Sequence, residues 1–175
     1  MPLKNILPFE NYVLTTNLSV EEVLKRMADN IQPKEGFKFF AGFNRNYAKP
    51  YTGYIIGRTF TMNRNINYRN SFLPVITGQI VIVSGKTAVK IKMQLGTVVL
   101  IFMSFWLGVI GLVCIGILVA GFSEHGQVFS NEFSPAFLIP FGMLVFGCLL
   151  THFGFKGESK KSKAFLANLL ESVEE

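Results

Sequence analysis

The sequence predicts an α+β membrane protein, in which an antiparallel β-sheet domain with two amphipathic helices accompanies a two-helix transmembrane hairpin. Three observations support this fold class. Only 16% of the 175 residues are charged, against about 25% in typical soluble domains. The apolar residues concentrate in two long uncharged runs. The remaining segments alternate apolar and polar residues with the period of a strand or of a helix.

The N-terminal part predicts a short strand followed by a helix. Residues 12–16 are β-branched or apolar and predict the strand. Ser19 and Glu22 have the spacing of a capping box, which predicts a helix over 20–31. Pro33 then ends the helical pattern. The apolar positions at helical spacing are Val20, Val23, Leu24, Met27 and Ile31.

The next segments change to a period of two and predict antiparallel strands. One strand is expected over 37–43 and a longer one over 51–68. Strands over 75–83 and 87–94 flank the turn residues Ser84-Gly85-Lys86, so they predict a β-hairpin. The last strand leads directly into an apolar run, which places the sheet close to the membrane surface.

Two uncharged runs predict the transmembrane helices. Residues 95–122 contain no charged side chain, and a second run begins at Ser134-Pro135. Each exceeds the roughly 20 residues that a helix needs to cross a bilayer. The predicted organisation is a cytosolic β-rich domain at 1–94, a first span at 95–122, a short loop at 123–133, a second span at 134–155, and a basic segment with an amphipathic helix at 156–175.

The charges that flank the spans predict their orientation. The loop between them carries Glu124, His125 and Glu132 but no Lys or Arg, whereas lysines precede the first span and follow the second. The positive-inside rule then places both termini in the cytoplasm. Residues 1–8 have no apolar core of a signal peptide. We expect a multi-pass protein of the cell inner membrane.

The C-terminal segment predicts a second amphipathic helix, expected from Lys160 to Val173. Its apolar face comprises Phe165, Leu166, Leu169, Leu170 and Val173. This helix is expected to pack on the sheet, because a sheet with one apolar face needs a cover. The alternative is that it lies in the lipid headgroup region.

The order of these elements resembles two known groups of proteins. A strand at 12–16, a helix at 19–31, antiparallel strands and a helix at 160–173 resemble a reduced START-like or helix-grip domain with a transmembrane hairpin before its last helix. The chain also resembles small bacterial two-span membrane proteins with a cytosolic β-domain, some of them pleckstrin-homology-like. About five strands are too few for the deep cavity of START-like domains, so lipid binding is not implied.

No catalytic, metal or cofactor site is predicted. Gly85-Lys86-Thr87 matches the end of a P-loop, but Ile80 stands where that motif needs a glycine. His125 and His152 have no second ligand at metal-binding spacing. Cys114 and Cys148 both lie in apolar runs. We therefore expect a protein that is not an enzyme and uses no cofactor.

The basic excess predicts binding at an anionic surface. Residues 1–94 carry 13 Lys or Arg against five Asp or Glu, a net charge of +8. We expect the lipid bilayer as partner. The lysines expected at the membrane surface are Lys90, Lys92, Lys156, Lys160, Lys161 and Lys163. A nucleic-acid platform is the less favoured alternative, on aromatic residues that interleave with basic ones: Lys38, Phe39, Phe40, Phe43, Arg45, Tyr47, Lys49, Tyr51, Tyr54 and Arg58.

Two further sets of residues are candidates for binding. Arg58 and Arg64 fall on the apolar face of the long predicted strand. They either extend outward at the ends of the sheet or form an anion site for a lipid headgroup or a partner's carboxylates. Small residues permit close contact between transmembrane helices. Those expected at such contacts are Ser104, Gly108, Gly111, Gly116, Ala120, Gly142 and Gly147.

Three classes of function remain open. The leading expectation is a non-enzymatic membrane scaffold or accessory subunit whose basic domain binds a protein partner or anionic headgroups. The second is an oligomerising membrane-active effector or pore-former, as in bacterial defence, and the third is a membrane-bound enzyme. Two spans bury little surface by themselves, so we expect a homo-oligomer or a heteromeric membrane partner.

Overall fold

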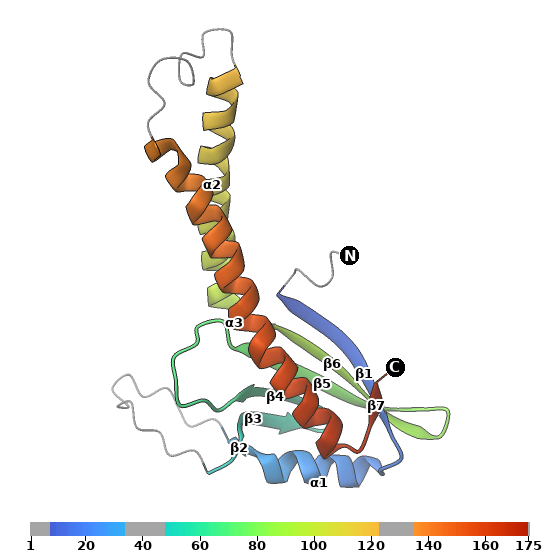
Figure 1. Ribbon diagram of the computed structural model, residues 1–175. Coiled ribbons are helices and arrows are strands. Elements are labelled where there is room, and N and C mark those ends of the chain that lie inside the picture. Colours follow the sequence, from blue (N-terminus) through green and yellow to red (C-terminus); the bar gives the residue numbers. More distant parts are fainter. Residues whose placement is uncertain (1–7, 34–47, 123–134, 175) are drawn as a thin grey trace. The chain divides into compact units, whose positions relative to one another are not determined.

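The computed structural model describes residues 8–33, 48–122 and 135–174. Within them, seven strands form one sheet in the order β2-β3-β4-β5-β6-β1-β7. The chain divides into two units (Figure 1), a sheet domain formed by Met1–Gly96 with Gly154–Glu175 and a pair of apolar helices in Thr97–Phe153. The predicted α+β class with a mostly antiparallel sheet is confirmed. The expected strand over 37–43 and the expected loop over 123–133 lie outside the described residues.

The first strand and helix follow the prediction. β1 spans Phe9–Thr16 and α1 spans Val20–Asn30. The Ser19 hydroxyl accepts a hydrogen bond from the backbone N–H of Glu22 at 3.2 Å, which caps the helix. After α1 the chain becomes extended and forms β2, Ile31–Pro33, which pairs in parallel with β3.

The long strand expected over 51–68 is wrong, because it is two strands. β3 (Tyr51–Ile56) and β4 (Thr59–Arg64) form a hairpin around Gly57, whose φ is +57°. A two-residue turn reverses the in-out alternation from one strand to the next. Phe60 and Met62 are therefore buried, whereas Tyr54 and Ile56, which share their parity in the sequence, are exposed.

The second predicted hairpin is confirmed. β5 spans Pro74–Val83 and β6 spans Lys86–Leu95, in register from Pro74 opposite Leu95 to Val83 opposite Lys86. Ser84 and Gly85 both have positive φ, at 50° and 78°. Two successive left-handed residues are the requirement of a type I′ turn, whose twist matches that of the strands.

The separate C-terminal helix expected over 160–173 is also wrong. After the 3₁₀ turn η2 (Pro135–Leu138), α3 runs without a break over Ile139–Leu169. The polar residues after Phe155 stay helical because Glu158, Ser159 and Ser162 are buried on the helix side that faces the sheet. The chain then leaves the helix at Glu171, whose φ is 48°, and forms β7, Val173–Glu174, beside β1.

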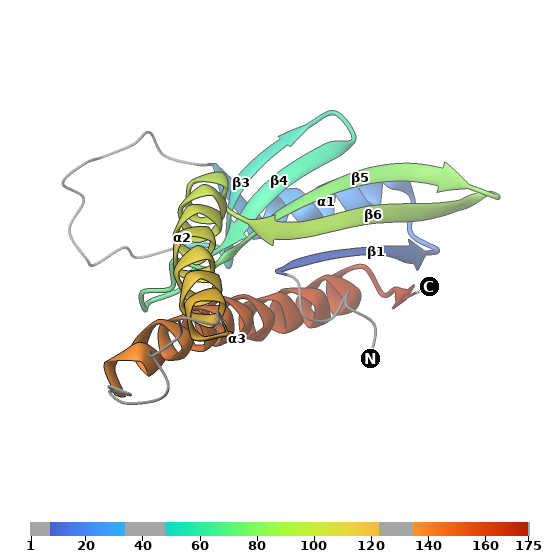
Figure 2. The same ribbon diagram turned by 90° about the horizontal axis from the view of Figure 1, so that it is seen from above.

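The core of the sheet domain lies between one face of the sheet and two helices. α1 crosses beneath β4 and β5, and the part of α3 after Gly154 lies alongside β1 (Figure 2). The Tyr51 and Phe165 rings are 4.9 Å apart, and the Ser159 hydroxyl contacts the Met93 sulfur at 3.5 Å. The largest fully buried side chains are Leu14, Val23, Met27, Tyr51, Phe60, Met62, Ile76, Ile80, Met93, Phe155, Leu166 and Leu170.

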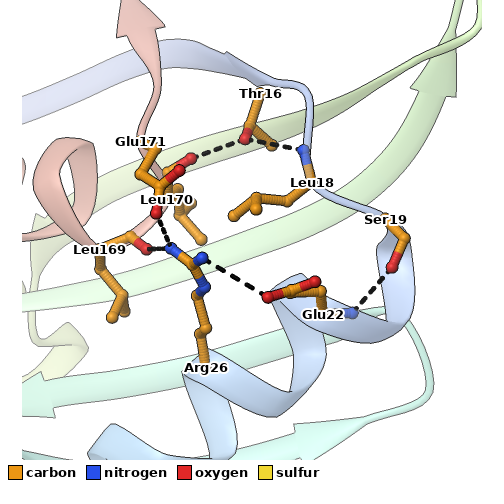
Figure 3. Close-up of polar contacts among 8 residues, drawn as sticks. All are labelled: Thr16, Leu18, Ser19, Glu22, Arg26, Leu169, Leu170 and Glu171. Carbon is orange, nitrogen blue, oxygen red and sulfur yellow. Dashed lines mark hydrogen bonds and ion pairs between the residues drawn. The ribbon is translucent and has the colours of Figure 1, made fainter.

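Polar contacts join α1 to the end of α3 (Figure 3). The Arg26 guanidinium donates to the Leu169 carbonyl at 2.9 Å and to the Glu171 carboxylate at 2.7 Å. The buried Thr16 hydroxyl donates to the Leu170 carbonyl at 2.6 Å. These contacts satisfy the last carbonyl groups of α3, which have no partner inside the helix. The C-terminal part of α3 therefore packs on the sheet domain, as expected from its apolar face.

Candidate functional site

Among the described residues of the sheet domain, the most tightly enclosed charged group is the carboxylate of Glu158, which is 3% exposed. It lies on α3 and receives three donors. Arg64 at the end of β4 approaches Oε2 at 2.5 Å, and Lys161, one turn along α3, approaches Oε1 at 2.8 Å. The Tyr68 hydroxyl also donates to Oε1. A buried charge is stable only when it is paired and hydrogen-bonded in this way.

The surroundings of Glu158 set its protonation. Burial raises the pKa of the Glu158 carboxyl, but hydrogen bonds from Lys161, Tyr68 and Arg64 outweigh burial and hold that pKa below its ordinary value. The hydrogen bond to Glu158 raises the pKa of the Tyr68 hydroxyl. Glu158 therefore stays ionised at neutral pH and does not have the raised pKa of a general acid.

The loop between β4 and β5 reinforces this contact. Asn70 donates from its side-chain amide to the Gly154 carbonyl at 2.9 Å and accepts from the backbone N–H of Phe72 at 2.9 Å. The Phe72 ring packs so closely on Gly154 that a Cβ there would lie 2.9 Å from Cδ2. The loop and Glu158 together fix the start of the sheet-packed part of α3, which is a structural role.

The two candidate arginines do not come together. Arg58 is exposed in the turn between β3 and β4, whereas Arg64 lies at the other end of β4. Six residues of strand separate their Cα atoms by about 20 Å. The charge of Arg64 is moreover neutralised by Glu158. A joint anion site of Arg58 and Arg64 is therefore not formed, because the turn at Gly57 removes Arg58 from the packed face.

The six candidate membrane-surface lysines divide into two groups. Three contact partners within the sheet domain: Lys156 pairs with Glu10 at 2.6 Å, Lys161 pairs with Glu158, and Lys163 lies 4.8 Å from the centre of the Tyr12 ring. The other three are exposed, namely Lys90 and Lys92 on β6 and Lys160 on α3. In the described part of the chain, no acidic side chain forms an ion pair with these last three.

Lys90 and Lys92 belong to the face of the sheet opposite the helices, which we call the open face. Within the sheet domain, α1 and the part of α3 after Gly154 lie on the other face (Figure 2). A shallow hollow of about 680 Å³ runs across it over β1, β6, β5 and β4. The strand register places Thr77 and Asn11 beside Lys92, and Gln79 and Val13 beside Lys90. Sequence reasoning missed this face because the turn at Gly57 decides which residues of β3 and β4 belong to it.

The two apolar helices contact each other mainly through large side chains. α2 spans Thr97–Phe122, and its buried residues Met103, Ile110 and Cys114 recur at helical spacing. Among the predicted small residues only Gly147 is buried, and a Cβ there would lie 2.4 Å from the Trp106 ring. The others are exposed or half-exposed, namely Ser104, Gly108, Gly111, Gly116, Ala120 and Gly142.

Metal-ligating side chains do not cluster in the part of the chain that the structure describes. Nowhere in 8–33, 48–122 or 135–174 do three or more His, Cys, Asp or Glu side chains gather as metal ligands. Comparison of the chain with protein-family models, curated proteins and solved structures finds no match. The features of the described chain that bear on function are its two apolar helices and the charges of the sheet domain.

Proposed function

We propose that the chain is a non-enzymatic membrane scaffold or accessory subunit. Two helices anchor it in a bilayer, and its basic sheet domain binds a partner at the membrane surface. Both termini face the cytoplasm. The inner membrane of a bacterium is the proposed location, in line with the lysines that flank the two apolar runs.

One observation carries this proposal, which is the exposed apolar surface of α2 and of the first half of α3. Both helices are long and apolar enough to cross a membrane. Their outward side chains are large and apolar, with Val98 81% exposed, Phe105 72% and Leu112 70%. Exposure of such an apolar surface to water is very unfavourable, whereas its contact with the hydrocarbon of a bilayer is not.

The anchoring is tested by fractionating cells that express the full chain with a C-terminal fluorescent protein. We expect the chain to stay in the membrane pellet after alkaline carbonate and to leave it in detergent. Two reporters test the orientation. The C-terminal fluorophore should fluoresce if that terminus is cytoplasmic, and an alkaline-phosphatase fusion within residues 123–134 should be active if that loop is extracytoplasmic. Release by carbonate would contradict the proposal.

The scaffold function is tested by native mass measurement in mild detergent. A defined complex with another protein is the expected result. A closed homo-oligomer that also releases a trapped dye from vesicles would instead identify a membrane-active effector. A stable monomer that releases no dye would exclude both forms of assembly.

A further inference from the structure

We infer that the open face of the sheet binds an acidic segment of a partner protein. This inference rests on the proposed function, because it names the surface and the partner chemistry of that scaffold. It depends on the strand register, on the distribution of charge and on the shape of the open face.

Two adjacent rows of side chains in the middle of the open face run across four antiparallel strand pairs. Asn11, Lys92, Thr77, Thr61 and Tyr54 form the first row. Val13, Lys90, Gln79, Thr59 and Ile56 form the second. The first row therefore places a lysine among four side chains with hydrogen-bonding groups, and the second row places a lysine among two polar and two apolar side chains. At the β3 end, Tyr54 is 52% exposed and Ile56 is 68% exposed.

Charge is distributed unequally between the two sides of the sheet. Every acidic side chain that the structure describes in the sheet domain lies on the side of the helices. Glu10 pairs with Lys156 of α3, and the others belong to α1, to α3 or to the segment after α3: Glu21, Glu22, Asp29, Glu158 and Glu171. The described strand residues of the open face include no Asp or Glu. This face is therefore cationic without an internal counter-charge.

An acidic polypeptide fits these features. Lys90 and Lys92 are two residues apart on one strand, so their Cα atoms are about 6.7 Å apart. Carboxylates at alternate positions of an extended segment repeat at the same spacing. The Thr, Gln and Asn side chains on the neighbouring strands can donate hydrogen bonds to a polar segment and accept hydrogen bonds from it. Charge-assisted hydrogen bonds to the lysines would supply the specificity.

Two other anionic partners fit less well. A planar lipid surface would contact the exposed Lys90 and Lys92 without filling the hollow between the strands. A single nucleic-acid strand would need aromatic side chains on which its bases stack, but the centre of the open face carries Thr61, Thr77 and Gln79. Among the described strand residues of this face, the aromatic side chains are Tyr54 on β3 and Phe9 on β1, and β4, β5 and β6 separate these two strands. An acidic protein segment therefore fits the open face better than a lipid surface or a nucleic acid does.

The test uses the full chain in mild detergent and a fluorescent ten-residue peptide of alternating Glu and Thr. The double variant Lys90→Glu/Lys92→Glu reverses both charges of the open face. The matched control Lys25→Glu/Lys160→Glu reverses two exposed lysines on the helix side. We expect the first pair to weaken binding about tenfold or more, and the second to change it less than about twofold. A Lys-Thr peptide should not bind.

Several outcomes would overturn the inference. An equal loss of peptide affinity in both double variants would show that the peptide is attracted to net charge alone. If the Glu-Thr peptide does not bind the unmodified chain, an acidic segment is excluded as the partner. Vesicles of phosphatidylcholine and phosphatidylglycerol, or a ten-residue oligothymidylate, are run in parallel. If binding of the vesicles or of the oligothymidylate depends on Lys90 and Lys92 while binding of the peptide does not, the partner is not a protein. The neutral variant Lys90→Gln/Lys92→Gln separates charge from misfolding. Carbonate extraction is measured separately on the same protein. A failure of membrane anchoring can therefore be distinguished from a failure to bind the acidic peptide.

Discussion

The Arg64 guanidinium and the Glu158 carboxylate meet at 2.5 Å, although 94 residues separate them in the chain. Glu158 is 3% exposed, whereas the side chain of Arg64 is 31% exposed. The carboxylate therefore depends on its partner more than the guanidinium does, because Arg64 can turn toward water. This pair joins β4 to α3 and fixes the position of the helix on the sheet.

Replacing Arg64 with Leu should destabilise the sheet domain more than replacing Glu158 with Leu. Loss of Arg64 leaves a buried carboxylate short of a donor, which costs about 3 kcal/mol in comparable pairs. Loss of Glu158 leaves Arg64 and Lys161 free to be solvated. Unfolding of the full chain by urea in detergent, followed by circular dichroism, measures both. The double variant should be more stable than Arg64→Leu alone, and equal effects of the two single variants would contradict this account.

Stability should fall in acid through Glu158. Its folded-state pKa is lowered, because the hydrogen bonds from Lys161, Tyr68 and Arg64 outweigh the opposing effect of burial. A carboxyl with a lowered pKa contributes stability above its ordinary value of 4.5 and loses that contribution as the pH falls through the lowered pKa. The midpoint of thermal unfolding should therefore fall between neutral pH and about pH 3, and it should fall less in Glu158→Gln than in the unmodified chain. Parallel curves for the two proteins would contradict the prediction.

Much of the fold could be predicted from local patterns. Ser19 with Glu22 marked the start of α1, and Ser84-Gly85 marked the hairpin of β5 and β6, because caps and tight turns depend on residues next to each other. The boundary between β3 and β4 was missed since Gly57 and Arg58 continue the alternation without a run of turn residues. The two-residue turn at Gly57, whose φ is positive, was enough to reverse the chain direction and the alternation of buried and exposed positions.

The candidate site depended on long-range contacts that the sequence does not display. Nothing near Glu158 in the chain indicates that Arg64 and Tyr68 will surround it, so the sequence pattern made Arg64 a candidate for an external anion. The continuity of α3 was missed for the same reason. Its polar residues after Phe155 predict a break when considered alone, but they become helical by packing on the sheet.

Gly78→Ala should destabilise the sheet domain by steric conflict with Phe60. The two residues are directly opposite each other on β5 and β4, and a Cβ on Gly78 would lie 2.1 Å from the Phe60 ring. Overpacking of this kind costs about 1–3 kcal/mol. The variant Gly78→Ala/Phe60→Leu removes the conflict and should recover part of the loss. Urea unfolding compares the three proteins. If the double variant is less stable than Gly78→Ala, packing of the Phe60 ring is not the cause.

Ser84→Asn should stabilise the hairpin of β5 and β6. Ser84 has a φ of 50°, a conformation that Asn adopts more readily than Ser. Asn-Gly is the preferred pair of a type I′ turn, so the gain should be about 0.5 kcal/mol. Thermal unfolding detects it as a rise in the midpoint. Gly85→Ala should act in the opposite direction, because Gly85 has a φ of 78°. A fall in midpoint for Ser84→Asn would contradict the assigned turn.

Gly147→Ala should disturb the contact between the two apolar helices. The added Cβ would lie 2.4 Å from the Trp106 ring, so the ring or the helix must move. Trp106 is the only tryptophan of the 175 residues, so tryptophan fluorescence reports on the surroundings of this one side chain. We expect a shift of its emission maximum in detergent or in bilayers. Gly142→Ala is the matched control, because no atom lies within 4 Å of a Cβ at that position. The same shift in both variants would show that Trp106 responds to helix composition and not to contact with Gly147.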